Sequence, residues 1–468
     1  MGTGLRRCCL ALLVALSGTA VAGAPEAPRV GTRGDLPVSG VLRVGTSGDY
    51  APFSLASATT PGGVDGFDVV LARSYAEERG LTLELVPFTW PTLLRDLARG
   101  RFDAAMSGIT VRPERSLAGR FSVPVAESGA VVLLHGHVPA KNLEELDQRR
   151  FRIGVNAGGH LERVTRQHFK LATLVSIPEN AGVLRAFRQL SVDAVVTDTL
   201  EAPSWQAVVE DAKRIGPFTR DRKAMLVHPD RGALAADLDR WLLDREADGN
   251  LARLRRHWLD EAPNRRFTTP LVALAAASDE RLALMPWVVA AKRQEVRPIA
   301  DPPREKRVIE AGIAAVARAA EASGRPAPPE EAVRAFYRAQ IEAAKQVQLR
   351  AGRDESFVPQ DPIPDLKGEL RPALIRIGER IAALLVALPE GLSEGHVARV
   401  VRDGLRSPWL DEREEGKLAL AFFEVASWRG GPAQDDGSGA ELEGEPQAQR
   451  EKKRANQPAA KGSARQTP

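Results

Sequence analysis

The stretch that decides the fold of the first half is VLRVGTSGD, residues 41–49. Its first five residues predict a short strand, and its last three predict a turn. Helical spacing of apolar residues follows over 66–79, a second strand pattern over 81–87, a helix over 92–97, and a buried strand over 103–106. Because strand and helix patterns alternate, we expect an α/β domain with a mostly parallel sheet.

The same alternation restarts after about residue 133. A strand pattern at 151–155 runs into Gly158 and Gly159, and further strand patterns lie at 174–177 and 193–196. A helical pattern at 183–190 separates the last two strands. Two units of similar build predict two lobes, which together form one domain over residues 41–262.

The first 22 residues have the features of a signal peptide. Arg6 and Arg7 precede an apolar run at 10–16, and the small-x-small sequence AVA occupies 20–22. We expect cleavage after Ala22 and export to a bacterial periplasm. Residues 23–40 are rich in proline and glycine and are interpreted as a linker.

The second half differs from the first in composition and in hydrophobic pattern. Residues 270–428 are rich in Ala, Leu, Arg and Glu, strand patterns vanish, and proline-rich breaks separate the segments. These features predict an all-helical bundle. Residues 429–468 contain almost no large apolar side chains, so we expect a disordered tail.

The composition narrows the classes of function. The 468 residues are 43% hydrophobic and 27% charged, and the net charge of +4 is spread along the chain, which gives no argument for nucleic acid. Cys8 and Cys9, the only cysteines, lie in the signal segment, so the exported protein has no thiol chemistry. We expect no metal, no cofactor and no stable membrane insertion.

Charged residues follow two buried strands of the first half. Arg115 comes just after the strand at 103–106, and Asp198 and Glu201 follow the strand at 193–196. Ligands of open α/β sheets collect at the carboxyl ends of strands, where a guanidinium can grip a carboxylate. Glycine at 108 and 158–159 lets backbone donors approach a ligand. The alternative interpretation is that Arg115 and Asp198 form surface or hinge ion pairs.

Several motifs of this half resemble those of periplasmic amino-acid-binding proteins (solute-binding protein family 3). They are LRVGTSGDYAPF (42–53), GFDV (66–69), FDAAMSGIT (102–110) and FSVP (121–124). Two others, TWPTLLRD (89–96) and TDTLEA (197–202), are most similar to the enzymatic branch of that family, cyclohexadienyl dehydratase. The resemblance implies a two-lobed periplasmic-binding-protein fold.

The resemblance also implies roles for individual residues. Trp90 and Glu201 belong to the active site, and Glu201 is the general acid that protonates the leaving hydroxyl of prephenate or arogenate. A carboxyl against Trp90 in a closed cleft has a raised pKa and can be protonated at neutral pH. Arg115 holds a substrate carboxylate, and Thr110 and Asp198 contribute to binding.

Two positions depart from the dehydratase pattern. His160 stands where the family commonly has a threonine, and it either binds a carboxylate or caps a helix. Ala130 stands where the dehydratase used for comparison has a lysine near the hinge. These changes leave the preference between prephenate and arogenate open.

A second set of charged residues lies in the helical half. Arg281 and Lys292 are eleven positions apart, about three turns, which places them on one face of a helix unless Pro286 kinks it. Asp301 is expected to cap a new helix, and Arg304 lies in the first turn of that helix. Taken singly, such residues are usually solvated.

The segments around these residues resemble the exported subclass of all-helical chorismate mutases, also called the gamma subclass. The resemblance implies that Arg281, Lys292, Arg304 and Arg371 are the cations of the site and that Gln348 contacts the ether oxygen of the substrate. Glu305 is a further expected binding residue. Ala344 and Val308 replace a hydroxyl residue and a glutamine that are common in that family.

The favoured hypothesis is a bifunctional exported enzyme, in which chorismate becomes prephenate in the bundle and prephenate becomes phenylpyruvate in the first domain. Arogenate, which would give phenylalanine, is a further candidate substrate. One alternative is an amino-acid receptor of a transporter fused to a chorismate mutase, and another is a pure binding module. The sequence leaves homo-oligomerisation open.

Overall fold

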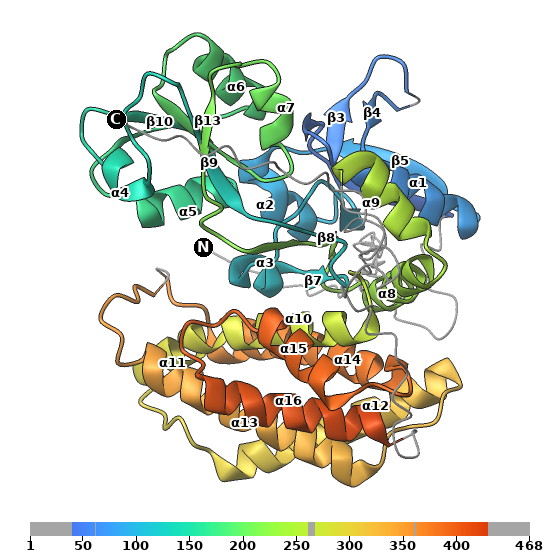
Figure 1. Cartoon of the computed structure of the whole chain (residues 1–468). Coiled ribbons are helices and arrows are strands. Elements are labelled where there is room, and N and C mark those ends of the chain that lie inside the picture. Colours follow the sequence, from blue (N-terminus) through green and yellow to red (C-terminus); the bar gives the residue numbers. More distant parts are fainter. Residues whose placement is uncertain (1–39, 61, 261–266, 360–361, 429–468) are drawn as a thin grey trace, which may run out of the picture.

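The computed structural model describes residues 40–60, 62–260, 267–359 and 362–428. The predicted signal segment 1–22, nearly all of the linker 23–40, and the tail 429–468 lie outside these residues. Within them the chain forms an α/β half and an all-helical half that pack against each other (Figure 1).

The first lobe of the α/β half is built on a five-stranded sheet of order β5-β1-β6-β15-β7. Strand β1 pairs in parallel with β5 and β6, as the alternating pattern predicts. The strands are β1 (Val41–Thr46), β5 (Thr82–Pro87), β6 (Ala104–Ala105), β7 (Arg120–Phe121) and β15 (Leu226–Val227), and β2 (Asp49–Tyr50), β3 (Ser54–Ala56) and β4 (Val64–Asp65) form a separate small sheet. The helices are α1 (Phe67–Glu78), η1 (Trp90–Thr92), α2 (Leu93–Ala98), α3 (Pro113–Ala118), α8 (Gly232–Ala247) and α9 (Asn250–Leu259).

The second lobe repeats this construction, with strand order β11-β10-β12-β9-β13. Strand β10 is parallel to β11 and β12, whereas β9 is antiparallel to β12. The strands are β9 (Ala130–Leu134), β10 (Arg152–Asn156), β11 (Thr173–Ile177), β12 (Ala194–Asp198) and β13 (Lys213–Ile215), and the helices are α4 (Leu143–Leu146), α5 (His160–His168), α6 (Asn180–Arg188) and α7 (Ala202–Gln206). The predicted restart of the pattern is therefore a second lobe.

Two short antiparallel strands, β8 (Ala126–Ser128) and β14 (Asp221–Lys223), connect the lobes. Side chains alternate across a strand, so Asp221 and Lys223 share one face of β14 and Arg222 has the other. Lys223 lines the cavity between the lobes, whereas Arg222 donates to Asp279 of the helical half. The hinge therefore faces both halves of the protein.

The second half is all-helical, as expected. Its helices are α10 (Pro270–Ala283), α11 (Met285–Gln294), α12 (Pro302–Ser323), α13 (Glu330–Ala351), η2 (Leu366–Leu370), α14 (Arg371–Ala387), α15 (Glu394–Gly404) and α16 (Glu412–Ser427). None of the helices in the described ranges is long and apolar enough to cross a membrane.

One helix was predicted too long. Arg281 and Lys292 do not share a continuous helix, because α10 ends at Ala283 and α11 begins at Met285. Pro286 lies in the first turn of α11, where a backbone N–H has no partner within the helix, so its absence breaks no hydrogen bond. Within a longer helix the proline ring would clash with the preceding turn, so α10 does not continue through it. The predicted cap at Asp301 is confirmed, since its side chain accepts a hydrogen bond of 3.1 Å from the Arg304 N–H.

Candidate active sites

A cavity lies between the two lobes of the α/β half. Trp90, Thr110 and Arg115 line it from the first lobe, and His160 and Asn180 line it from the second. The lining residues leave only about 30 Å³ of free volume, room for a water molecule or two. The lobes are therefore closed on each other, and a larger ligand enters only when they move apart.

Glu201 is buried beside this cavity and is held by two side chains of its own lobe. It follows β12 at the start of α7 and is 2% exposed. Asn180 Nδ2 and Thr197 Oγ1 each donate to its carboxyl group at 2.6 Å. Burial raises the pKa of Glu201 well above its ordinary value, and the neighbouring Asp198 raises it further. A carboxyl in this setting keeps its proton to a higher pH than an exposed glutamate does.

Asp198 is the anionic centre of a buried network that crosses the cleft. Its Oδ1 accepts from the backbone N–H groups of Leu200 and Glu201. Its Oδ2 accepts from Tyr50 of the first lobe and lies 3.1 Å from Lys223 Nζ of the hinge. The sequence indicated Asp198 but missed both of these partners.

Asn180 links the acid to the first lobe. Its Nδ2 donates to the Asp49 carbonyl oxygen at 3.1 Å as well as to Glu201, and its backbone N–H donates to Asp49 Oδ2 at 3.3 Å. Trp90 Nε1 donates to Asp49 Oδ1 at 3.2 Å. We expected the Glu201 carboxyl to lie against Trp90, whereas these hydrogen bonds join the two residues through Asp49 and Asn180.

Arg115 and Thr110 meet at the edge of the cleft. Arg115 is 1% exposed, donates to the Thr110 carbonyl oxygen at 2.9 Å, and lies 5.9 Å from the centre of the Trp90 ring. Burial lowers the pKa of Arg115, and nearby Arg112 lowers it further. An anion at the cleft edge would offset this cost of desolvation. Thr110 Oγ1 also accepts from Lys223 Nζ at 3.1 Å.

Three expectations about this cleft need refinement. His160 is the first residue of α5, whose N-cap position is Gly159, and His160 Nε2 lies 2.9 Å from Asp221 Oδ1 of the hinge. Ala130 offers no charge, but Lys223 supplies a cation in the cleft. The Gly108 N–H, expected to face a ligand, instead donates to Asp68 Oδ2 at 2.6 Å.

Comparison with known proteins places this half in a family. Residues 42–261 match the model of the bacterial extracellular solute-binding proteins, family 3. A cyclohexadienyl dehydratase of Pseudomonas aeruginosa is 37% identical over 227 residues, which are 47% of this chain and 84% of that protein. The chain belongs to the family 3 solute-binding proteins.

Other proteins that resemble this chain are named as amino-acid-binding proteins. The L-cystine-binding protein TcyJ of Escherichia coli is 25% identical, covering 47% of this chain and 82% of the relative. The arginine-binding protein 1 of an Escherichia coli ABC transporter is 26% identical, over 47% of this chain and 91% of that protein. Similarity to the family therefore leaves both an enzyme and a receptor as candidates for the cleft.

The helical half, which lies outside the matched solute-binding protein region, gathers a second group of cations. Lys292 of α11, Arg304 of α12 and Arg371 of α14 are close enough to repel one another. Burial lowers the pKa values of Lys292 and Arg304, and Arg371 lowers both further. Lys292 Nζ donates to the Ile299 carbonyl oxygen at 2.7 Å. Three helices thus bring together cations that are far apart in the sequence.

The remaining expected residues of this half contact other groups of the bundle. Gln348 Nε2 donates to the Ala344 carbonyl oxygen at 3.1 Å and lies 3.6 Å from Met285 Sδ. Its buried Oε1 accepts no hydrogen bond from the described residues. Arg281 lies 3.5 Å from the Gln340 carbonyl oxygen, and burial lowers its pKa. Glu305 instead pairs with Lys345 at 3.3 Å.

Proposed function

We propose that this chain is an exported bifunctional enzyme. Its solute-binding-protein half converts prephenate to phenylpyruvate, or arogenate to phenylalanine, and its helical half converts chorismate to prephenate. The observation that carries the first activity is the buried Glu201 carboxyl, whose pKa is raised, in a closed cleft that also holds cations. The 37% identity to a cyclohexadienyl dehydratase supports the same assignment.

The dehydration chemistry requires an acid because hydroxide is a poor leaving group. Glu201 would donate its proton to the C4 hydroxyl as the C–O bond breaks, which releases water. The electron pair of the C–CO₂ bond moves into the ring, carbon dioxide leaves, and the ring becomes aromatic. Arg115 would hold a substrate carboxylate at the cleft edge. Lobe closure removes water, which strengthens these interactions.

Glu201→Gln tests the acid directly. Glutamine keeps the size of the side chain but has no acidic proton, so we expect prephenate turnover to fall by about 10²–10⁴-fold. The rate of the parent protein should fall as pH rises through the raised pKa of Glu201, because only the protonated carboxyl donates. Turnover is followed by phenylpyruvate absorbance, and exposed Glu210→Gln is the matched control.

The second candidate is an amino-acid receptor, which the similarity to cystine- and arginine-binding proteins favours. A receptor would bind an amino acid tightly and leave prephenate unchanged. If neither the parent protein nor Glu201→Gln consumes prephenate, calorimetric titration with cystine and arginine distinguishes the receptor. Equal turnover of prephenate by both proteins would instead show that Glu201 is not the proton donor.

The mutase activity is supported by the cation cluster of Lys292, Arg304 and Arg371. The rearrangement of chorismate is concerted, and negative charge builds on the ether oxygen as its bond breaks. Lys292 and Gln348 would stabilise that charge in the transition state. Arg281, Arg304 and Arg371 would hold the two carboxylates in the reactive geometry.

Lys292→Ala separates the two activities. Chorismate consumption should fall by about 10²-fold or more because one charge-stabilising donor is removed from the transition state. Prephenate dehydration should be unchanged, since Lys292 lies in the helical half. Exposed Lys306→Ala on α12 is the matched control. Undiminished consumption of chorismate by Lys292→Ala would contradict the assignment.

A further inference from the structure

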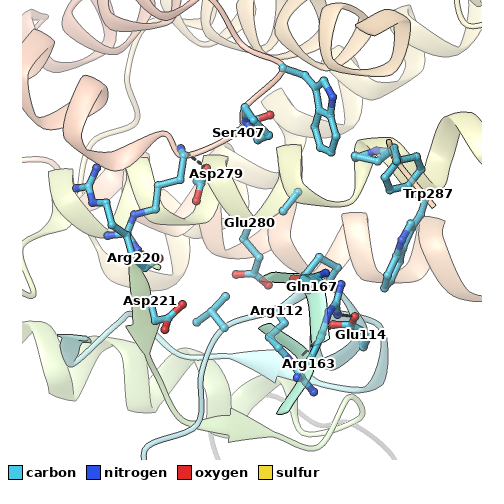
Figure 2. A pocket seen from close by; sticks show the side chains of 18 of the residues that line it. Arg112, Glu114, Arg163, Gln167, Arg220, Asp221, Asp279, Glu280, Trp287 and Ser407 are labelled. Atoms are coloured by element: carbon cyan, nitrogen blue, oxygen red, sulfur yellow. Dashed lines mark hydrogen bonds and ion pairs between the residues drawn. The ribbon is translucent and has the colours of Figure 1, made fainter. Parts of the chain in front are cut away.

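A chamber of about 980 Å³ lies between the α/β half and the helical half, separate from the cation cluster of the mutase proposal. Residues after β6, from α5 and from the hinge strand β14 line it on one side, and α10, α11 and two loops of the bundle line it on the other (Figure 2). Its volume is that of a small-molecule site.

The charges that line the chamber leave an excess of cations. Its four carboxylates are engaged, for example Asp221 with His160 and Asp279 with Arg222. Six lysine and arginine side chains face them. Burial and a neighbouring arginine together lower the pKa values of Arg163 and Arg406 to about 10, although Arg163 pairs with Glu114 and Arg406 pairs with Glu127. An anion in the chamber would stabilise these charges.

Buried hydrogen-bonding capacity on the chamber wall is also unused. Nε of Arg112, Nε of Arg406 and the Ser407 hydroxyl are buried and make no hydrogen bond to any described residue. Arg112 and Arg406 lie on opposite sides of the chamber, on the α/β half and on the bundle. Arg112 Nε lies 3.7 Å from Glu114 Oε2, beyond hydrogen-bond distance. Buried polar atoms normally make hydrogen bonds, so donors on two walls that make none indicate a place for an acceptor such as a carboxylate.

The bundle side of the chamber is aromatic. Trp287 of α11, Phe357 and Trp409 line it, and the rings of Phe357 and Trp409 lie 5.7 Å apart at 84°. Figure 2 shows Trp287 on the side away from Arg220. Aromatic rings on the bundle side, together with cations on both sides, suit a ligand that has a carboxylate and an apolar ring.

The chamber also adjoins the cleft of the α/β half. Asp221 lines the chamber and pairs with His160, which lines the cleft. Arg112 lines the chamber and lies 3.5 Å from the carbonyl oxygen of Gly159, another cleft residue. One layer of side chains therefore separates the two spaces.

We propose that the chamber is a second binding site, specific for carboxylates that bear a six-membered ring. The identity of the natural ligand rests on the proposed function, whose substrates and product belong to this chemical class. The site itself rests on the chamber geometry alone. Its Arg163, Arg406 and Trp409 side chains bind the carboxylate and the ring.

The test uses 4-fluorophenylacetate as the probe and fluorine NMR of the full chain as the readout. Binding should weaken about tenfold in Arg163→Ala and in Trp409→Leu, neither of which lines the cleft, and Arg163→Lys should restore most of it. Exposed Arg188→Ala on α6 is the control. Neutral 4-fluorobenzyl alcohol should bind at least tenfold more weakly than the acid.

Two results would overturn the chamber site. One is equal affinity of the parent protein, Arg163→Ala and Trp409→Leu for the probe, and the other is equal binding of the acid and the alcohol. Thermal melts identify a variant that has lost its fold. If Trp409→Leu unfolds, Arg163→Ala alone tests the site, because the Arg163 side chain is 37% exposed and its removal should leave the fold intact. Since the readout needs no turnover, it stands whether or not the protein consumes prephenate.

Discussion

Asn180 is the residue that joins lobe closure to the proposed acid, because it donates to Asp49 of one lobe and to Glu201 of the other. Asn180→Ala should lower the kcat of prephenate dehydration by about tenfold or more, the worth of a hydrogen bond to a charged group. Its amide lowers the pKa of Glu201, so removing it raises that pKa. The alkaline limb of the pH–rate profile should therefore move to higher pH.

A merely structural role of Asn180 would reduce activity without moving that limb. Exposed Glu179→Ala, at the preceding position, is the control and should leave both kcat and the limb unchanged. An unchanged limb in Asn180→Ala, together with a lower kcat, would mean that the amide does not act on the carboxyl group.

For individual residues, the sequence indicated the cleft side chains that follow the ends of strands. Trp90, Arg115 and Glu201 all lie around one cleft, because the carboxyl ends of parallel strands meet there. The sequence did not indicate Lys223, which lies in the charged run RDRK at 220–223. Such a run normally predicts a solvated loop. Here the two lobes bury Lys223, and that burial depends on contacts far apart in the sequence.

At the scale of elements, helices α12 and α13 pack through a glycine. A methyl group added at Gly312 would lie 2.4 Å from the Tyr337 ring, so Gly312→Ala forces that ring to move. We expect a loss of about 1–3 kcal/mol in the free energy of unfolding, as for other overpacked sites. Chemical denaturation measures it.

Gly378→Ala on α14 is the matched substitution, and we expect it to raise the free energy of unfolding. No described atom outside the immediate backbone lies within 4 Å of the added methyl group. Alanine is favoured over glycine inside a helix, so the variant should gain about 0.5–1 kcal/mol. If both substitutions destabilise the protein equally, close packing at Gly312 is not the cause.

Element boundaries could be predicted where local chemistry decides them. The cap at Asp301 followed from its side chain and from Pro302, which act within one turn. The break between α10 and α11 was foreseen only as a kink at Pro286. Whether a proline bends a helix or ends it depends on what packs around it, and that information is not local.

At the scale of the whole molecule, the sequence predicted two halves but not their docking. Arg222 of the hinge donates to Asp279 of α10, and Arg380 of α14 donates to the carbonyl oxygens of Phe121 and Ser122 in the first lobe. Arg376 of α14 donates to the carbonyl oxygens of Ser116 and Leu117 in α3. Each side chain alone fits a solvated helix face, so only the assembled structure reveals the interface.

Glu280 is the buried centre of that interface. It is 6% exposed, accepts a hydrogen bond of 2.8 Å from Ser116 Oγ, and pairs with Arg380. Glu280→Gln leaves the Arg380 charge without its partner in a buried position, which costs about 3–5 kcal/mol. Calorimetry should show a lower Tm, or separate transitions for the two halves.

Glu379 offers the comparison that tests this reasoning, because it also joins the halves, through Arg120 at 2.7 Å, but is 52% exposed. An exposed ion pair contributes about 0–1 kcal/mol because water and salt screen it. Glu379→Gln should therefore leave the calorimetric transition nearly unchanged, and added salt should weaken only this pair. Equal shifts in Tm for Glu280→Gln and Glu379→Gln would show that burial at Glu280 does not hold the two halves together.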